Sequence, residues 1–416
     1  YSCAFRAFGA PQAFFAVECQ IDELARRLNM DPTEIRLKNI LRDGDRTIFG
    51  QVMKKSRGLG LEECIKKVRD KIGWDNPFDR DDGVIKRGKG FAVFMYGTGV
   101  PLLFEGATCY VNLQTDGSAN VNVSVTEMGQ GIVTTLTQIA AETLGTRYQD
   151  IVVSYSDTAT SPDSGPTVGS RAATIVGNAV FDASKKLKER ILDFASKEFN
   201  ADPRDMDVKD GQVFIVGKRE TAVSLGTVVN KMYLNQIPLA AIGAWYPPRP
   251  SFGVEDGQGN PMHAYTFGAQ GVEVEVDTET GFVNVVRSVY AADVGKALNP
   301  TIVEGQIEGG IAQGMSWAIM EESLMKDGIM KNASFQNYYI PTIKDMPDLE
   351  SIIVECPNDL GPYGAKGIGE PPLIPTAPAI RNAVYDALGI KLNVIPLTPE
   401  RILNAIKNNS GPTNRR

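Results

Sequence analysis

Residues 361–372 read GPYGAKGIGEPP, and they constrain the backbone more tightly than any other stretch of the chain. Four glycines surround Lys366, and two prolines follow Glu370 directly. Glycine allows unusual dihedral angles and the close approach of a ligand, whereas proline stiffens the chain that follows. Glu370 is therefore predicted to lie on a rigid backbone with little space around it, which suits a general base. The alternative is a carboxylate that caps the next helix.

Two other glycine-rich loops each lead into a predicted helix. They are TEMGQG at residues 126–131 and SGPTVGSRAATIVGN at residues 164–178. The free N–H groups of a helix start favour an anion such as a phosphate, and the Ser170 hydroxyl and the Arg171 cation suit the same ligand. Each loop alone is also compatible with an ordinary tight turn. Together they predict a long anionic ligand.

Two more segments contain candidate site residues, and a third resembles a phosphate-binding loop. AFRAFGAPQ, residues 4–12, places Phe8 in a Gly/Pro loop, where the ring either lines a pocket for a planar substrate or plugs the core. Gln306 lies in the glycine-rich stretch VEGQIEGG, where it either donates to a ligand or permits close helix packing. GVIKRGKG at residues 83–90 approaches a phosphate-binding loop but has Gly90 where a hydroxyl is needed, so we interpret it as linker.

Composition excludes several classes of protein. With 416 residues, 43% of them hydrophobic, the chain is expected to form more than one packed unit. No apolar run reaches the roughly 18–20 residues that span a bilayer, so we expect no membrane partner. The net charge of −7, with dispersed Lys and Arg, argues against a nucleic-acid partner.

Cysteine and histidine usage limits the metal chemistry. The five cysteines form no CxxC pair and their number is odd, which indicates a reducing, cytoplasmic location. The single histidine, His263, receives no role. Because a zinc or iron site needs several ligands at short spacing, a cofactor would have to carry any transition metal.

The pattern of apolar residues predicts an α+β fold in two lobes of mixed sheets and helices, because strand pairs alternate with helices without a regular βαβ repeat. Helices are expected at residues 11–29, 31–41, 61–72, 133–144, 172–199, 304–320 and 377–388. Strands are expected at 90–96, 109–113, 119–125, 151–155, 267–277, 282–291 and 352–355, and a further hairpin at 207–216. Residues 76–90 are predicted to be a linker.

Three regions follow from this pattern. Residues 1–80 are predicted to be a helical segment that joins the second lobe. Residues 81–220 would form the first, cofactor-binding α+β lobe, and residues 221–416 the second α+β lobe with the catalytic glutamate.

In this order, the segments AFRAFGAPQ, TDGS…TEMGQG, SGPTVGSRAATIVGNAV, AADVGKALNP…VEGQIEGG and YGAKGIGEPP resemble the molybdenum hydroxylase family, which includes xanthine dehydrogenase, aldehyde oxidoreductase and nicotinate dehydrogenase. The resemblance implies molybdenum held by a pterin dithiolene, without a protein side chain on the metal. It implies hydroxylation of an electron-poor carbon, with water as the oxygen source. It also implies a terminal sulfido or selenido ligand on the molybdenum, so the enzyme would contain selenium in the second case.

The resemblance also assigns roles to residues. Glu370 matches the family's catalytic base, and Phe8 matches a ring that packs on the substrate. Arg6 belongs to the same substrate-binding segment, with its backbone close to the molybdenum. The positions that match cofactor contacts are Gly129, Gln130, Gly131, Ser170, Arg171, Ala172, Thr174, Gln306, Lys366, Gly367 and Gly369.

Departures from the family pattern shape the expected partners. An FGGK-type motif that lies upstream in the family is absent, so the chain resembles the C-terminal portion of a molybdopterin-binding subunit, split as in nicotinate dehydrogenase. We expect a second chain with the N-terminal half, separate [2Fe–2S] and FAD subunits, and the pterin as a cytosine dinucleotide.

The expected substrate is a small N-heteroaromatic acid such as nicotinate. Residues 98–100 contain no aromatic residue where the xanthine-type pattern has a second phenylalanine. An aldehyde oxidoreductase, a purine or xanthine dehydrogenase, and a non-catalytic scaffold that binds the cofactor stay open as alternatives.

Overall fold

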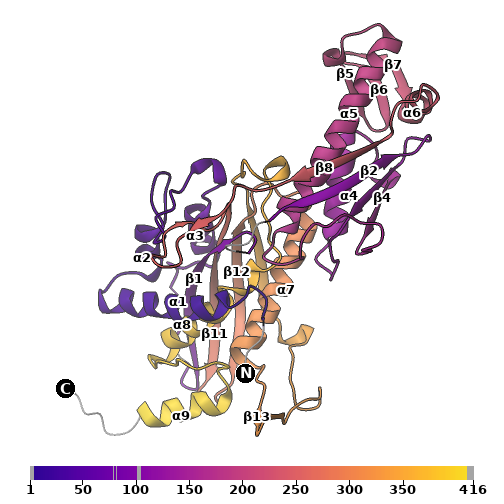
Figure 1. Ribbon diagram of the computed structural model, residues 1–416. Coiled ribbons are helices and arrows are strands. Elements are labelled where there is room, and N and C mark those ends of the chain that lie inside the picture. Colours follow the sequence, from indigo (N-terminus) through magenta and orange to yellow (C-terminus); the bar gives the residue numbers. More distant parts are fainter. Residues whose placement is uncertain (1–3, 78, 81, 101–104, 410–416) are drawn as a thin grey trace.

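The computed structural model describes residues 4–77, 79–80, 82–100 and 105–409, and it consists of two lobes joined end to end (Figure 1). The lower lobe contains both ends of the described chain, and the upper lobe is formed by the middle of the sequence. Each lobe is built on its own four-stranded sheet. The prediction of an α+β fold in two lobes is therefore confirmed.

The sheet of the lower lobe has the order β1-β11-β12-β15. Its strands are β1 (Ile85–Gly97), β11 (Tyr265–Asp277), β12 (Val283–Asp293) and β15 (Asp348–Val354). β1, β11 and β12 pair antiparallel, whereas β15 pairs parallel with β12. The long apolar runs of β11 and β12 have buried residues on both faces of the sheet, as expected for strands covered on both sides.

Helices cover this sheet. Helix α8 (Thr376–Leu388) packs on β1 and β11, and α3 (Leu61–Lys71) packs on β11 and β12. Helix α7 (Pro300–Ile319) contacts α8 and β15. Helix α1 (Ala10–Arg27) contacts α8, and α2 (Pro32–Asn39) contacts α1.

The sheet of the upper lobe has the order β4-β3-β2-β8, and helices α4 and α5 pack against it. A second, three-stranded sheet with helix α6 forms the tip of this lobe (Figure 1). The elements of the upper lobe are β2 (Ala107–Leu113), β3 (Ala119–Val123), α4 (Ile132–Leu144), β4 (Ile151–Tyr155), α5 (Gly177–Phe199), β5 (Met206–Lys209), β6 (Gln212–Ile215), β7 (Lys218–Ser224), α6 (Leu225–Leu234) and β8 (Ala240–Trp245).

Short elements complete the chain. Two small hairpins are formed by β9 (Ser251–Phe252) with β10 (Gly259–Asn260), and by β13 (Met325–Lys326) with β14 (Ile329–Met330). Helix α9 (Pro399–Asn409) is the last described element. Among the described residues, no helix combines the length and apolar character needed to cross a membrane.

All the predicted helices are present, with ends shifted by a few residues. One local prediction is wrong: residues 85–90, interpreted as linker, form the first half of β1. Gly88 and Gly90 lie directly against α8, where a Cβ on Gly90 would come within 2.0 Å of the Ala379 carbonyl oxygen. These glycines allow β1 to pack closely on α8. Because glycine is also common in loops, the sequence pattern alone suggested a linker.

Two strands pair across the predicted lobe boundaries. β1 falls in the region assigned to the first lobe, but it pairs with β11 in the lower sheet. β8 falls in the region assigned to the second lobe, but it pairs with β2 in the upper sheet. Both exchanges depend on pairings between residues more than 100 positions apart, which local sequence patterns do not specify.

Candidate active site

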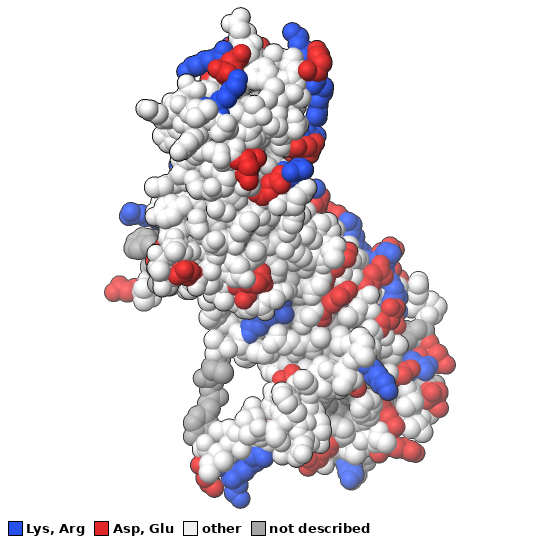
Figure 2. Space-filling view, turned by 90° about the vertical axis from the view of Figure 1, so that its right-hand side faces the viewer, with Lys and Arg blue, Asp and Glu red and all other residues white. Residues whose placement is uncertain are grey.

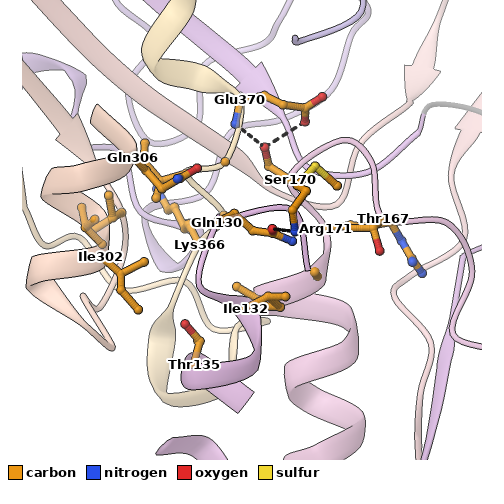
Figure 3. A pocket seen from close by; sticks show the side chains of 18 of the residues that line it. Gln130, Ile132, Thr135, Thr167, Ser170, Arg171, Ile302, Gln306, Lys366 and Glu370 are labelled. Carbon is orange, nitrogen blue, oxygen red and sulfur yellow. Dashed lines mark hydrogen bonds between the residues drawn. The ribbon is translucent and has the colours of Figure 1, made fainter. Parts of the chain in front are cut away.

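A pocket of about 580 Å³ lies where the two lobes meet. Its walls come from the loop before α1, the loops before α4 and α5, helix α7 and the 361–372 loop (Figure 3). The predicted site residues that line it are Arg6, Phe8, Gly129, Gln130, Ser170, Arg171, Ala172, Gln306, Lys366, Gly367, Gly369 and Glu370. Segments more than 360 residues apart in sequence are thus brought together, as the candidate residues require.

Glu370 is half-buried at one end of this pocket, and three groups from the surrounding elements donate to its carboxylate. The Ser170 hydroxyl and the Tyr96 hydroxyl donate to Oε2 at 2.9 and 3.1 Å. The Ala7 backbone N–H donates to Oε1 at 3.3 Å. These donors fix the orientation of the side chain.

The backbone around Glu370 explains why glycine is needed there. The Glu370 N–H donates to Ser170 Oγ at 3.0 Å, so the 361–372 loop and the 164–178 loop are joined at this point (Figure 3). A Cβ on Gly367 would lie 1.8 Å from the Ser170 carbonyl oxygen. Ser170 itself has a positive φ of 53°, which turns its hydroxyl toward the glutamate.

Tyr96 was not predicted from the sequence. It is the penultimate residue of β1. It lies two positions before residues 98–100, where the xanthine-type pattern has its second phenylalanine. Burial, and then the negative charge of Glu370, raises the pKa of the Tyr96 hydroxyl, so it stays protonated and acts as a donor. The sequence signal was an aromatic residue at a strand end, but its contact depends on the tertiary structure.

The loop before α1 presents two groups to the pocket. Ala7, Phe8 and Gly9 have consecutive positive φ values of 75°, 50° and 87°, a conformation that is costly for the first two residues. This turn points the Ala7 N–H at Glu370 and leaves the Phe8 ring 55% exposed at the pocket. Strain of this kind is concentrated at functional sites.

Arg6 holds the floor of the pocket together. Its Nε donates to the Gly369 carbonyl at 2.7 Å, and its terminal nitrogens reach the side-chain oxygens of Gln306 and Gln313 on α7 at 3.4 and 3.5 Å. Burial lowers the pKa of the guanidinium, which the charge of Glu370 partly offsets. Arg6 therefore links the N-terminal loop, α7 and the segment that carries Glu370.

The start of α4 is not open to an anionic ligand, contrary to our expectation. The carboxylate of Glu127 accepts from the N–H groups of Gly129, Gly131 and Val133 at 2.9, 3.0 and 3.1 Å. Although partial burial opposes it, these N–H groups lower the pKa of Glu127. The carboxylate of Glu127 therefore binds at the helix start where we expected a phosphate.

The other helix start remains available. Ala172 and Ala173, in the first turn of the π-helical segment Ala172–Val176 that leads into α5, line the pocket. The N–H groups of a first turn have no partner within the helix. Of the two predicted anion-binding helix starts, this one is not closed by a carboxylate, and its first-turn residues line the pocket.

The Arg171 cation points into the protein, not at a ligand. Its guanidinium donates to the carbonyls of Ser164, Pro166 and Gly106 at 2.6, 3.0 and 2.8 Å, and it lies 3.3 Å from Glu105. The side chain is 2% exposed. Arg171 therefore shapes the loop, and our expectation that its charge meets a phosphate is wrong.

Lys366 is also turned inward. Its ammonium forms an ion pair with Asp293 at 2.5 Å, and both side chains are completely buried. It also donates to the Gly58 carbonyl at 3.0 Å. The ammonium is thus engaged inside the lower lobe, and it anchors the chain just before Gly367.

The remaining predicted residues differ in position. The Gln130 amide folds back on its own loop, accepting from the Met128 N–H at 2.6 Å and donating to the Thr126 carbonyl at 2.7 Å. Gly131 and Thr174 do not line the pocket. Gly131 precedes α4, and the buried Thr174 hydroxyl donates to the Arg171 carbonyl at 3.0 Å.

Metal ligands are missing from the part of the chain that the structure describes: no three His, Cys, Asp or Glu side chains lie together as a metal site. A transition metal in this pocket would therefore need a cofactor that supplies its ligands. The pocket combines glycine backbones, the polar side chain of Gln306 and the apolar side chains of Ile132 and Ile302, as expected for a flat, partly polar ligand.

Comparison with family models gives two matches. A model described as the molybdopterin cofactor-binding domain matches residues 67–347. A second model with the same description matches residues 1–40. Together they include the N-terminal loop, the 126–131 and 164–178 loops, and all of α7.

Individual proteins are similar along almost the whole chain. The xanthine dehydrogenase molybdenum-binding subunit of Escherichia coli O157:H7 is 34% identical over 96% of this chain and 52% of its own length. The nicotine 6-hydroxylase large subunit of Paenarthrobacter nicotinovorans is 31% identical over 97% of this chain and 51% of its own length. The chain thus spans about half the length of these relatives.

A solved structure is similar in its fold. The crystal structure of quinoline 2-oxidoreductase from Pseudomonas putida 86 superimposes with a TM-score of 0.87 and 28% sequence identity. The match covers 97% of this chain and 53% of that chain.

Proposed function

The chain belongs to the molybdopterin cofactor-binding domain family, and from this premise we propose that it provides the catalytic base, Glu370, of a molybdenum-dependent hydroxylase. The observation that carries the proposal is the carboxylate of Glu370, oriented by three donors at the end of a pocket large enough for a cofactor. A scaffold that only stores a cofactor would not need such a base.

The hydrogen bonds indicate which oxygen of Glu370 accepts the proton. Oε2 already accepts from the Ser170 and Tyr96 hydroxyls. Oε1 accepts a single, longer hydrogen bond from the Ala7 N–H. Because each carboxylate oxygen has two lone pairs, Oε1 retains the capacity to take a proton from a reacting group.

The pocket residues fit a molybdopterin. No side-chain ligand set competes for the metal among the described residues, and the glycine backbones of the 361–372 loop allow close approach. Gly129, Gly367, Gly369, the first turn at Ala172 and the amide of Gln306 would contact the pterin. When bound, the cofactor supplies the two-electron oxidation, with water as the oxygen source.

An electron-poor N-heteroaromatic compound is the proposed substrate class. Two similar proteins are named for nicotine and quinoline, which are both N-heteroaromatic. Phe8 presents an exposed ring at the pocket, next to the residue that positions the glutamate. A planar ring stacked on Phe8 would place an edge carbon toward Glu370. Nicotinate is the member of this class that we would test first.

The proposed assembly has further parts. A polypeptide segment with the other half of the subunit would complete the pocket, because the relatives are about twice as long. Iron–sulfur and FAD subunits would take the two electrons. A native complex without a [2Fe–2S] signal in electron paramagnetic resonance would contradict this electron path.

Cofactor analysis of the native complex that contains this chain tests the proposal. We expect about one molybdenum and one pterin per chain, with the pterin released as a cytosine dinucleotide. Selenium in the complex would favour a nicotinate-type enzyme. Active material without molybdenum and pterin would overturn the proposed function.

Turnover tests the substrate class. The same complex should hydroxylate nicotinate faster than xanthine or benzaldehyde at equal concentrations. Preference for benzaldehyde would assign an aldehyde oxidoreductase, and preference for xanthine a purine dehydrogenase, with the same base in either case.

Replacement of Tyr96 with Phe is expected to lower kcat about 10- to 100-fold, because Glu370 loses one of the donors that orient it. KM should change little, since Tyr96 is not among the residues that line the pocket. Steady-state kinetics of the assembled enzyme measure both constants. A change confined to KM would place Tyr96 in substrate binding instead.

A further inference from the structure

The segment between α7 and β15 departs from the packing of the rest of the lower lobe. Within residues 321–345, all of which the structure describes, only Asn332 is buried. We name these residues the arm. In Figure 1 the arm, with β13, extends away from the body at the end of α7.

The arm exposes an unusual number of large apolar side chains. Six of them are at least half exposed, and two, Phe335 and Ile343, are 81% and 87% exposed. The six are Leu324, Ile329, Phe335, Tyr339, Ile340 and Ile343. Single exposed apolar residues need no explanation, but a concentration within 20 positions indicates a surface that another molecule covers.

The arm nevertheless has a defined conformation. The buried Asn332 side chain accepts from the Leu324 N–H at 2.9 Å and donates to the Glu322 carbonyl at 2.7 Å. The Tyr338 hydroxyl donates to Glu321 at 2.6 Å. These hydrogen bonds tie parts of the arm to one another and to the end of α7, while its apolar side chains stay exposed.

Helix α7 connects the arm to the pocket. Gln306 and Gln313 of this helix line the pocket, and the arm begins two positions after its last residue, Ile319. At the pocket itself, Phe8 and Met128 are also more than half exposed. A molecule that covers the arm and extends along α7 would therefore also reach the open pocket.

The side of the molecule that includes α7 has few charged residues. Figure 2, which faces the right-hand side of Figure 1, shows Lys, Arg, Asp and Glu crowded along one edge and sparse over the middle. On the outer face of α7, Gly305 and Gly309 have open space around them. Beside these glycines, Glu304 and Glu308 of α7 are exposed. A partner that extends along α7 would therefore meet carboxylates among small residues, and the apolar part of the contact lies on the arm.

We propose that the arm is the docking site for the half of the molybdopterin subunit that this chain does not include. The proposal rests on the proposed function. The relatives are nearly twice as long and match this chain over almost all of its length, so each contains about 400 further residues that need a contact surface here. A second copy of this chain would not explain why the arm is continuous with an incomplete pocket.

Cross-linking of the native complex tests the proposal directly. The arm contains three exposed lysines, Lys326, Lys331 and Lys344. A lysine-reactive cross-linker should join these lysines to the other half of the molybdopterin-binding subunit. That half lies outside the 416 residues and is recognised by its own molybdopterin cofactor-binding sequence pattern. Lys209 and Lys218 at the tip of the upper lobe serve as controls and should not form such links. Links only to a second copy, only to an iron–sulfur or FAD polypeptide, or none at all would overturn the proposal.

A pair of variants provides a second readout. In this experiment a tagged form of this chain and the other half of the subunit are expressed as separate polypeptides. The double variant Phe335→Ser with Ile343→Ser should lower the amount of the other half that co-purifies with the tagged chain at least tenfold. The control, Val216→Ser with Leu234→Ser, removes two apolar residues of the upper lobe that are more than half exposed, and it should change recovery less than twofold. Equal recovery with both pairs would refute the docking role.

The two proposals can fail separately. Molybdenum and pterin content reports on the proposed function, whereas cross-links and recovery report on the arm. A complex with arm cross-links but no molybdenum would leave the docking surface intact and remove the proposed function.

Discussion

Glu370→Gln in the assembled enzyme is expected to lower kcat roughly 10²- to 10⁴-fold while molybdenum and pterin content stay unchanged. Glutamine has the same size and its amide oxygen can still accept from the Ser170 and Tyr96 hydroxyls, so the pocket should keep its shape. The amide cannot take a proton at Oε1, where the carboxylate has capacity. Single-turnover reduction of the cofactor by substrate is the measurement that isolates this step.

A charge-matched control separates the base from a general effect of charge. Glu220→Gln removes one negative charge from exposed strand β7 at the tip of the upper lobe and should leave turnover within about twofold. Normal turnover of the Glu370 variant would refute its role as base. Loss of pterin from that variant would show that Glu370 supports cofactor binding, and kcat would then say nothing about proton transfer.

The candidate base could be predicted because its signal is local. Four glycines within residues 361–372 and the two prolines after Glu370 indicate a constrained backbone. In the structure, Glu370 of this segment lines the pocket. Its partners could not be predicted in the same way. Tyr96 reaches Glu370 because β1 pairs with β11, where Thr266, opposite Tyr96, donates to the Gly367 carbonyl at 2.9 Å. Such a register joins residues 170 positions apart.

Charged residues were the least predictable part of the site. Arg171 and Lys366 were both assigned to the cofactor from the family resemblance, yet both cations are buried against protein groups. Glu127 was overlooked, although an acidic residue just before a glycine-rich helix start is a known capping pattern. A sequence shows where charge is available, but burial decides whether the protein uses it internally.

Lys366→Met is expected to lower the free energy of unfolding by about 3–5 kcal/mol. The substitution leaves Asp293 completely buried without its cation. Three backbone N–H groups still donate to Asp293, from Gly60, Gly295 and Cys356 at 3.0, 3.0 and 3.3 Å, so the loss should fall near the lower limit. Urea unfolding followed by circular dichroism measures the change.

The double variant Lys366→Met with Asp293→Asn shows whether the effect comes from the unpaired charge. Removing both charges should restore part of the lost stability, because an amide can accept from the same N–H groups without a buried charge. Since Lys366 lies next to Gly367 and four positions before Glu370, the single variant should also bind the pterin less well, in proportion to its lost stability. Unchanged stability together with loss of the pterin would instead mean that Lys366 acts on the cofactor directly, and that the ion pair with Asp293 contributes little to holding the loop.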